Sequence, residues 1–106
     1  MSILKSLFFT WAALLLSCCT SNLYIPTSEN IATAQKNWPE TDSSSIFKGY
    51  LLYRDKCGNC HYLYKPGKYP GEKWESVLPV MKEKAKLSED EYEHIKIYLL
   101  ALSKPH

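Results

Sequence analysis

The amino-acid sequence predicts an all-α protein. Three segments place apolar residues at steps of three and four, and no stretch alternates between apolar and polar residues as a half-buried strand would. With 106 residues, the chain has the length of one small domain. It contains three Trp and eight Tyr but only four Gly, a composition typical of a folded protein rather than a disordered one. We therefore expect about three helices around a single core.

The first expected helix covers residues 44–61. A run of serines at positions 43–45 lies at its start, and these serines are candidate caps for its amino terminus. The side chains that fall at helical spacing along it are Ile46, Tyr50, Leu51 and Tyr53.

The second expected helix covers residues 71–87. Pro79 lies inside it and should break or kink it, because proline has no amide hydrogen and crowds the preceding turn. Its apolar face consists of Trp74, Val77, Leu78, Met81 and Ala85.

The third expected helix lies within residues 87–106. Ser88 and Glu91 form a capping box, in which each side chain satisfies the backbone amide of the other residue. Pro105 marks the end of the helix. The expected buried stripe consists of Tyr92, Ile95, Leu99 and Leu102.

The amino terminus has the layout of an export signal. An early Lys precedes an apolar run from Leu7 to Leu16, which is short for a membrane span of about 20 residues. The sequence Leu-Leu-Ser-Cys at 15–18 resembles the bacterial lipobox, in which the cysteine receives a diacylglycerol. We therefore expect a signal peptide at 1–17 and lipid attachment at Cys18; the alternative is an ordinary cleaved signal. Cys19 has no assigned role.

The sequence divides into three expected regions, of which the signal peptide is the first. Residues 18–44 contain the lipid-attachment cysteine and a stretch rich in Ser, Thr, Asn and Pro, which is expected to be a flexible spacer. The folded domain is expected at 45–106. An exported protein lies in an oxidising compartment, here the periplasmic side of a bacterial membrane. The formal net charge of +2 gives no indication of a nucleic-acid partner.

Residues 57–61 read Cys-Gly-Asn-Cys-His, and this motif carries the chemistry. A disulfide between Cys57 and Cys60 would close only a tiny loop and stabilise little. A thioredoxin-like redox pair expects a βαβ setting, and a zinc site needs four ligands, for which the chain adds only His94 and His106. The pattern is typical of covalent haem c, in which both thiols bond the porphyrin vinyl groups and His61 is an axial ligand. One bound haem would also fill the centre of a domain too small to pack well alone.

The stretch from Gly49 to Leu102 resembles the class I c-type cytochromes, which are small monohaem electron carriers. The run "GYLLYRDKCGNCH" is similar to the family's amino-terminal helix, and "LSEDEYEHIKIYLLAL" to its carboxy-terminal helix. The resemblance implies that these two helices cross at Gly49 and Tyr53, because a close crossing requires a small residue. It also implies that the segment "WESVLPVMKEKAKLS" carries the distal ligand.

Met81 is the expected sixth ligand of the iron. It is the only Met after the signal, although a Met on an apolar face is by default core filler. His94 and His106 are the alternatives, and either would give a bis-histidine centre. The carbonyl of Pro66 is the expected acceptor for the second nitrogen of His61, unless Pro66 only shapes a turn.

These observations predict an electron carrier rather than an enzyme, because two axial ligands leave no open site on the iron. The expected partners are a dehydrogenase or quinol-oxidising donor and an oxidase or reductase acceptor. Two alternatives remain: a haem enzyme or gas sensor with an open distal site, and a non-haem interaction lipoprotein that uses Cys57 and Cys60 for a disulfide or zinc.

Overall fold

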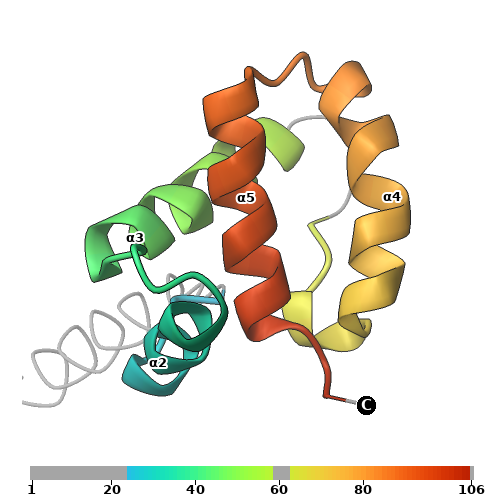
Figure 1. The fold of residues 1–106 in the computed structure, drawn as a ribbon. Coiled ribbons are helices and arrows are strands. Elements are labelled where there is room, and N and C mark those ends of the chain that lie inside the picture. The colour runs from blue at the N-terminus through green and yellow to red at the C-terminus, as the bar shows by residue number, and fades with distance from the viewer. Residues whose placement is uncertain (1–23, 59–62, 106) are drawn as a thin grey trace, which may run out of the picture.

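The computed structural model describes residues 24–58 and 63–105, and within these ranges the protein is all-helical, as the sequence predicts. Figure 1 shows α5 between α3 and α4, with α2 beside the carboxy-terminal half of α5. Tyr53–Cys57 form a π-helical turn directly after α3, and Pro66–Lys68 form a short 3₁₀ turn before α4. The helices are α2 (Ser28–Asn37), α3 (Ser43–Leu52), α4 (Gly71–Lys84) and α5 (Glu89–Leu102).

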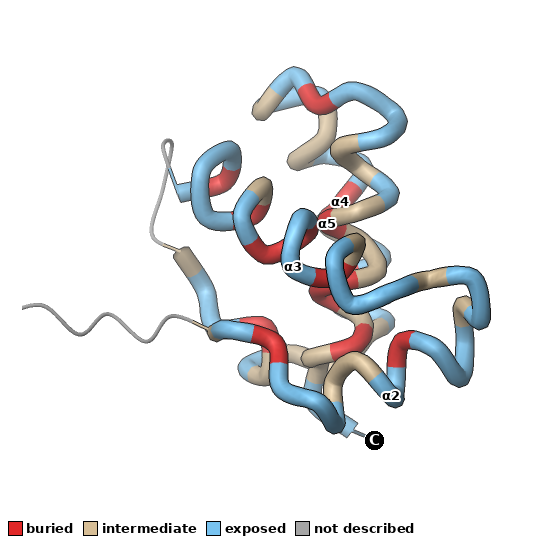
Figure 2. Tube along the Cα trace, turned by 90° about the vertical axis from the view of Figure 1, so that its left-hand side faces the viewer, coloured by how far each residue is buried: buried red, intermediate tan, exposed pale blue. Residues whose placement is uncertain are grey.

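Helix α5 is the centre of the fold. Its capping box is present as predicted: the Glu91 amide donates to the Ser88 hydroxyl (3.1 Å) and the Ser88 amide donates to the Glu91 carboxylate (3.0 Å). The buried positions gather where the helices face one another (Figure 2). On α5 these are Ile95, Tyr98, Leu99 and Ala101, whereas Tyr92 and Leu102 of the expected stripe are only half-buried. The stripe is therefore shifted toward Tyr98.

Helix α3 crosses α5 closely at Gly49, the position at which the family resemblance implies a crossing. A Cβ atom at this position would lie 2.2 Å from the backbone oxygen of His94 and 2.7 Å from the Cβ of Tyr98. The rings of Tyr50 and Tyr53 both contact the ring of Tyr98, with centroids 5.9 and 5.7 Å apart. The crossing therefore fixes the π-helical turn that continues α3.

Two details of α3 differ from the sequence-based expectation. Its cap is Asp42, not one of the serines, because the Asp42 carboxylate accepts from the Ser45 amide (2.8 Å) and the Ser44 hydroxyl (2.8 Å). Leu51 was expected in the buried face but is 43% exposed. It lies five residues after Ile46, a spacing that turns it away from the face shared by Ile46, Tyr50 and Tyr53.

Part of the expected spacer is a helix. Thr27 and Asn30 form a capping box at the start of α2, and the helix packs against α5. Ala34 is fully buried, and Ile31 and Trp38 pack partly against the core. These three residues follow helical spacing, but they form a narrow stripe in a polar segment, which is why the segment gives so weak an apolar signal.

Helix α4 continues through Pro79, so of the expected break or kink the break does not occur. Pro79 removes one amide donor within the helix, but Pro79 and Glu75 are both exposed. Water can therefore satisfy the carbonyl group that loses its partner. Trp74 and Leu78 are buried on the predicted face, and Met81 is half-buried.

Over residues 24–58 and 63–105, none of the helices is both long and apolar enough to span a bilayer. The expected signal peptide, Cys18 and Cys19 lie outside the described residues.

We predict that Gly49→Ala destabilises the protein by roughly 2 kcal/mol or more, because the added methyl group would force α3 and α5 apart. Denaturant unfolding followed by circular dichroism measures this loss. The matched control is Gly67→Ala, where a Cβ would be 3.5 Å from its nearest neighbour, the Leu102 oxygen. Equal stability of the two variants would contradict the close crossing.

We also predict that Asp42 contributes to the stability of the folded protein and that this contribution is lost in acid. The hydrogen bond from the Ser45 amide, followed by that from the Ser44 hydroxyl, holds the pKa of Asp42 below its ordinary value. A lowered folded-state pKa stabilises the protein above the unfolded pKa of about 3.9, and this stabilisation is lost as the pH falls through the folded value. Asp42→Asn should therefore be less stable than wild type at neutral pH, and the difference should shrink in acid. Urea unfolding at a series of pH values measures it, and a difference that does not change with pH would refute the assignment.

Candidate functional site

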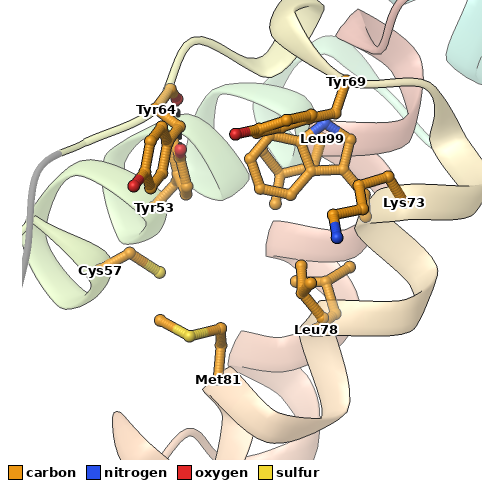
Figure 3. A pocket seen from close by; sticks show the side chains of 10 residues that line it. Tyr53, Cys57, Tyr64, Tyr69, Lys73, Leu78, Met81 and Leu99 are labelled. Atoms are coloured by element: carbon orange, nitrogen blue, oxygen red, sulfur yellow. Dashed lines mark hydrogen bonds between the residues drawn. The ribbon is translucent and has the colours of Figure 1, made fainter.

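One cavity of about 390 Å³ lies between the π-helical turn, α4 and α5. This volume is within the range of about 300–1,000 Å³ that is common for sites that bind cofactors and other small molecules. Its walls are largely aromatic and aliphatic: Tyr53, Tyr64, Tyr69 and Trp74, with Val77, Leu78 and Leu99. Cys57, Met81 and Lys73 complete the lining (Figure 3). The cavity is therefore lined mainly by apolar and aromatic groups, with a thiol and a thioether among them.

Cys57 and Met81 lie in the same cavity although they come from different elements. Cys57 is buried at the end of the π-helical turn, and Met81 is in α4. Figure 3 shows both side chains extending into one part of the cavity. The thiol expected to attach the haem and the thioether expected to bind its iron are thus brought together. Cys60 and His61 lie outside the described residues.

The π-helical turn is a feature that the sequence did not predict. In a π turn each hydrogen bond spans five residues instead of four, so side chains four positions apart lie more nearly on one face than in an α-helix. Tyr53 and Cys57 have this spacing, and both line the cavity. Such turns are frequent at functional sites. Here the turn aims the first cysteine of the motif into the cavity.

His94 does not line the cavity. Its Nδ1 lies 2.7 Å from the backbone oxygen of Asp90, on its own helix, and 3.5 Å from the Asp90 carboxylate. The side chain borders a separate depression beside Thr41 and Ser45. His94 therefore does not lie where an axial ligand of a haem in this cavity would have to lie. The other alternative ligand, His106, lies outside the described residues.

The aromatic side chains of the cavity contact one another in a continuous series. Trp74 meets Tyr53 edge-on, with ring centroids 6.3 Å apart, and meets Tyr69 with centroids 5.6 Å apart. Tyr69 in turn meets Tyr64 at 6.0 Å. Edge-to-face contacts at these distances stabilise a fixed arrangement of rings. From the sequence alone, Trp74, Tyr64 and Tyr69 could line a haem or bond a propionate, but aromatic residues near a cofactor most often serve packing, so the sequence assigns them no functional role.

Two hydrogen bonds, one buried and one partly buried, join these aromatic residues to the backbone that follows the motif. The indole Nε1 of Trp74 donates to the carbonyl of Pro66 (2.8 Å), and the hydroxyl of Tyr53 donates to the carbonyl of Tyr64. Burial, with smaller effects from Cys57 and Tyr24, raises the pKa of Tyr53, so its hydroxyl stays protonated and remains a donor. Pro66 was the expected acceptor for His61; its carbonyl has two lone pairs, and Trp74 uses one of them.

Charged groups are sparse in the lining. Lys73 contributes an ammonium group at the cavity, and Lys68 lies over the rings of Tyr64 and Tyr69, 5.1 and 5.5 Å from their centroids. Over the described ranges, no three His, Cys, Asp or Glu side chains cluster closely enough to hold a metal ion. The described part of the lining is therefore mainly apolar and aromatic, with a thiol from Cys57, a thioether from Met81 and one ammonium group from Lys73.

A family model described as "Dihaem cytochrome c" matches residues 53–106, slightly more than half of the 106-residue chain. The matched part begins at the π-helical turn and includes the Cys-x-x-Cys-His motif, α4 and α5. The match supports the expected c-type cytochrome, and it differs from the expected monohaem class I protein because its description names two haems. No curated protein and no solved structure is detectably similar to the chain.

Proposed function

Because the chain belongs to the dihaem cytochrome c family, we propose that it carries single electrons through one haem c attached to Cys57 and Cys60. His61 and Met81 are the proposed axial ligands. The observation that carries this proposal is the meeting of Cys57 and Met81 in one apolar cavity. Such a haem, with both axial positions filled, supplies reversible one-electron exchange and no open site for a substrate.

The proposal of one haem per chain rests on the number of attachment motifs. The family description names two haems, but the present sequence contains the Cys-x-x-Cys-His pattern once, at residues 57–61. The other two cysteines, Cys18 and Cys19, are adjacent to each other and are not followed by histidine. A second covalent haem would therefore lack its usual attachment site in this chain.

The residues of the cavity have distinct parts in this function. The apolar walls, among them Leu78 and Leu99, exclude water and lower the local dielectric, which are factors that tune the reduction potential of a buried haem. Met81 supplies a thioether, which favours a higher potential than a second imidazole would. Lys73 places a positive charge at the cavity, where it can offset the negative charge of a haem propionate.

We propose that the protein is exported and anchored through Cys18 to the periplasmic side of a membrane. The support is the signal-like amino terminus and its lipobox-like end. The fold limits how far the domain can lie from the membrane to which Cys18 would attach it. The backbone oxygen of Tyr24 accepts a hydrogen bond from the buried Tyr98 (2.6 Å), so the chain is already packed six residues after Cys18. Six residues extend at most about 20 Å, which keeps the domain close to the bilayer surface and near membrane-bound donors or acceptors.

We predict that Met81→Ala keeps its covalent haem but loses the weak far-red absorption band that marks iron–sulfur ligation. The reduction potential should also fall, on the order of 0.1 V, since axial ligands set haem potentials over a range of about 0.8 V. Visible spectroscopy and potentiometric titration of protein from a haem-competent host measure both effects.

The matched control is His94→Gln, which alters the alternative ligand outside the cavity and should leave the band and the potential unchanged. If the band survives in Met81→Ala, the assignment of Met81 as the axial ligand is wrong. If wild-type protein lacks the band but binds carbon monoxide at its haem, an open-site haem enzyme or sensor is the better function. A colourless protein would indicate the non-haem lipoprotein.

A further inference from the structure

The segment that leaves the attachment motif, residues 63–69, is called the exit segment here. It runs from the end of the motif to the start of α4 and forms one end of the cavity, where Tyr64 and Tyr69 contribute their rings (Figure 3). It contains one short 3₁₀ turn, Pro66–Lys68. Little regular backbone hydrogen bonding is therefore available to fix it, and its position depends on contacts with other elements.

The far end of the exit segment is held by backbone. The Lys104 amide, just beyond α5, donates to the carbonyl of Tyr69 (2.9 Å). The near end is held instead by two side chains of the cavity wall. Tyr53 donates its hydroxyl to the Tyr64 carbonyl, and Trp74 donates its indole N–H to the Pro66 carbonyl.

Tyr53 and Trp74 are themselves held firmly, so they can fix the position of the exit segment. Tyr53 is 3% exposed and Trp74 is 6% exposed, and their rings contact each other edge-on. Pro66 is also among the fully buried residues, so no solvent replaces the indole if the hydrogen bond is lost. A buried carbonyl left without a donor carries a larger penalty than the mean net gain of a hydrogen bond.

The two donors belong to the two elements that carry the sulfur atoms. Tyr53 is in the same π-helical turn as Cys57, and Trp74 is in the same helix as Met81. Trp74 and Met81 are seven residues apart, so they lie on one face of α4, two turns from each other. The Trp74–Pro66 hydrogen bond therefore ties the methionine helix to the backbone that follows the motif, and the Tyr53–Tyr64 hydrogen bond ties that same backbone to the first cysteine.

We propose that Tyr53 and Trp74 are positioning residues whose polar hydrogens set the distance between the haem-attachment side of the cavity and the Met81 thioether. This inference rests on the proposed haem function. Through the two hydrogen bonds, the exit segment acts as a spacer of fixed length between the π-helical turn and α4. Loss of either bond lets α4 move outward, and the iron–sulfur bond to Met81 becomes easier to displace.

The experiment compares Tyr53→Phe and Trp74→Phe with Tyr98→Phe in the full-length holoprotein. Each substitution keeps an aromatic ring and removes one polar hydrogen. Trp74→Phe also removes the second ring of the indole, so the Tyr53→Phe result is the one that Tyr98→Phe matches directly. Tyr98 is the matched control: it is fully buried and donates its hydroxyl to the Tyr24 carbonyl, but it does not line the cavity. All three variants should be less stable to heat, so unfolding temperature alone does not distinguish a positioning role.

The discriminating readout is the displacement of Met81 by added imidazole, followed by the far-red band. We expect Tyr53→Phe and Trp74→Phe to retain the covalent haem and to bind imidazole about five- to tenfold more tightly than wild type, the ratio that corresponds to one net hydrogen bond. Tyr98→Phe should bind imidazole as wild type does. The reduction potential should fall in the first two variants and stay unchanged in the third.

The inference is overturned if the two cavity variants bind imidazole as wild type does, if Tyr98→Phe shifts the affinity equally, or if the cavity variants lose their helical circular dichroism. These outcomes differ from a failure of the proposed function, in which the wild-type protein itself lacks the haem or the far-red band.

Discussion

The close crossing of α3 and α5 at Gly49 is the constraint on which the site depends. With no side chain at this position, the backbone of α3 approaches the His94 carbonyl and the Cβ of Tyr98 more closely than any other residue would permit. The approach brings Tyr50 and Tyr53 onto Tyr98, and Tyr53 begins the π-helical turn that ends at Cys57. A change in this crossing would therefore displace the first attachment cysteine relative to α4.

The same arrangement explains how a small chain can hold a large apolar cofactor. Helix α5 lies between α3 and α4 and packs on both (Figure 1). The cavity lies beyond the end of α3, where the π-helical turn, the segment before α4, α4 itself and α5 supply its lining. A domain of this size gains only a marginal core from its own side chains. A porphyrin in the cavity would supply the missing apolar contacts. Because it would be bonded to the chain, folding would bury its apolar surface together with that of the side chains around it.

Much of this architecture is predictable from the sequence because strong local signals coincide with it. The Ser88–Glu91 capping box and the Trp74–Leu78–Met81 face each follow from a local rule, and each is present in the fold. The close crossing at Gly49 is implied by the resemblance to the class I c-type cytochromes, and it is present as well. The attachment pattern and the single methionine after the signal are also visible in the chain, and the fold places Cys57 and Met81 in one cavity.

The features that the sequence did not predict depend on contacts between distant residues. The segment of α2 has only a weak apolar stripe, so the sequence predicts a flexible spacer there. Its packing against α5, which the sequence does not reveal, stabilises it as a helix. The π-helical turn has no known local signature, and the course of α4 through Pro79 depends on the exposure of that face. The hydrogen bonds from Tyr53 and Trp74 join separate elements, and the sequence pattern does not predict how these elements are arranged relative to each other.

The central claim is that one porphyrin is bonded to the chain in the cavity between the π-helical turn and α4. The intact mass of the purified protein from a haem-competent host, measured after extraction with acidified acetone, tests it most directly. The account predicts a polypeptide that remains coloured and carries the added mass of one haem. A colourless chain without added mass would contradict the cofactor, and the mass of two haems would contradict the proposal of a single attachment site.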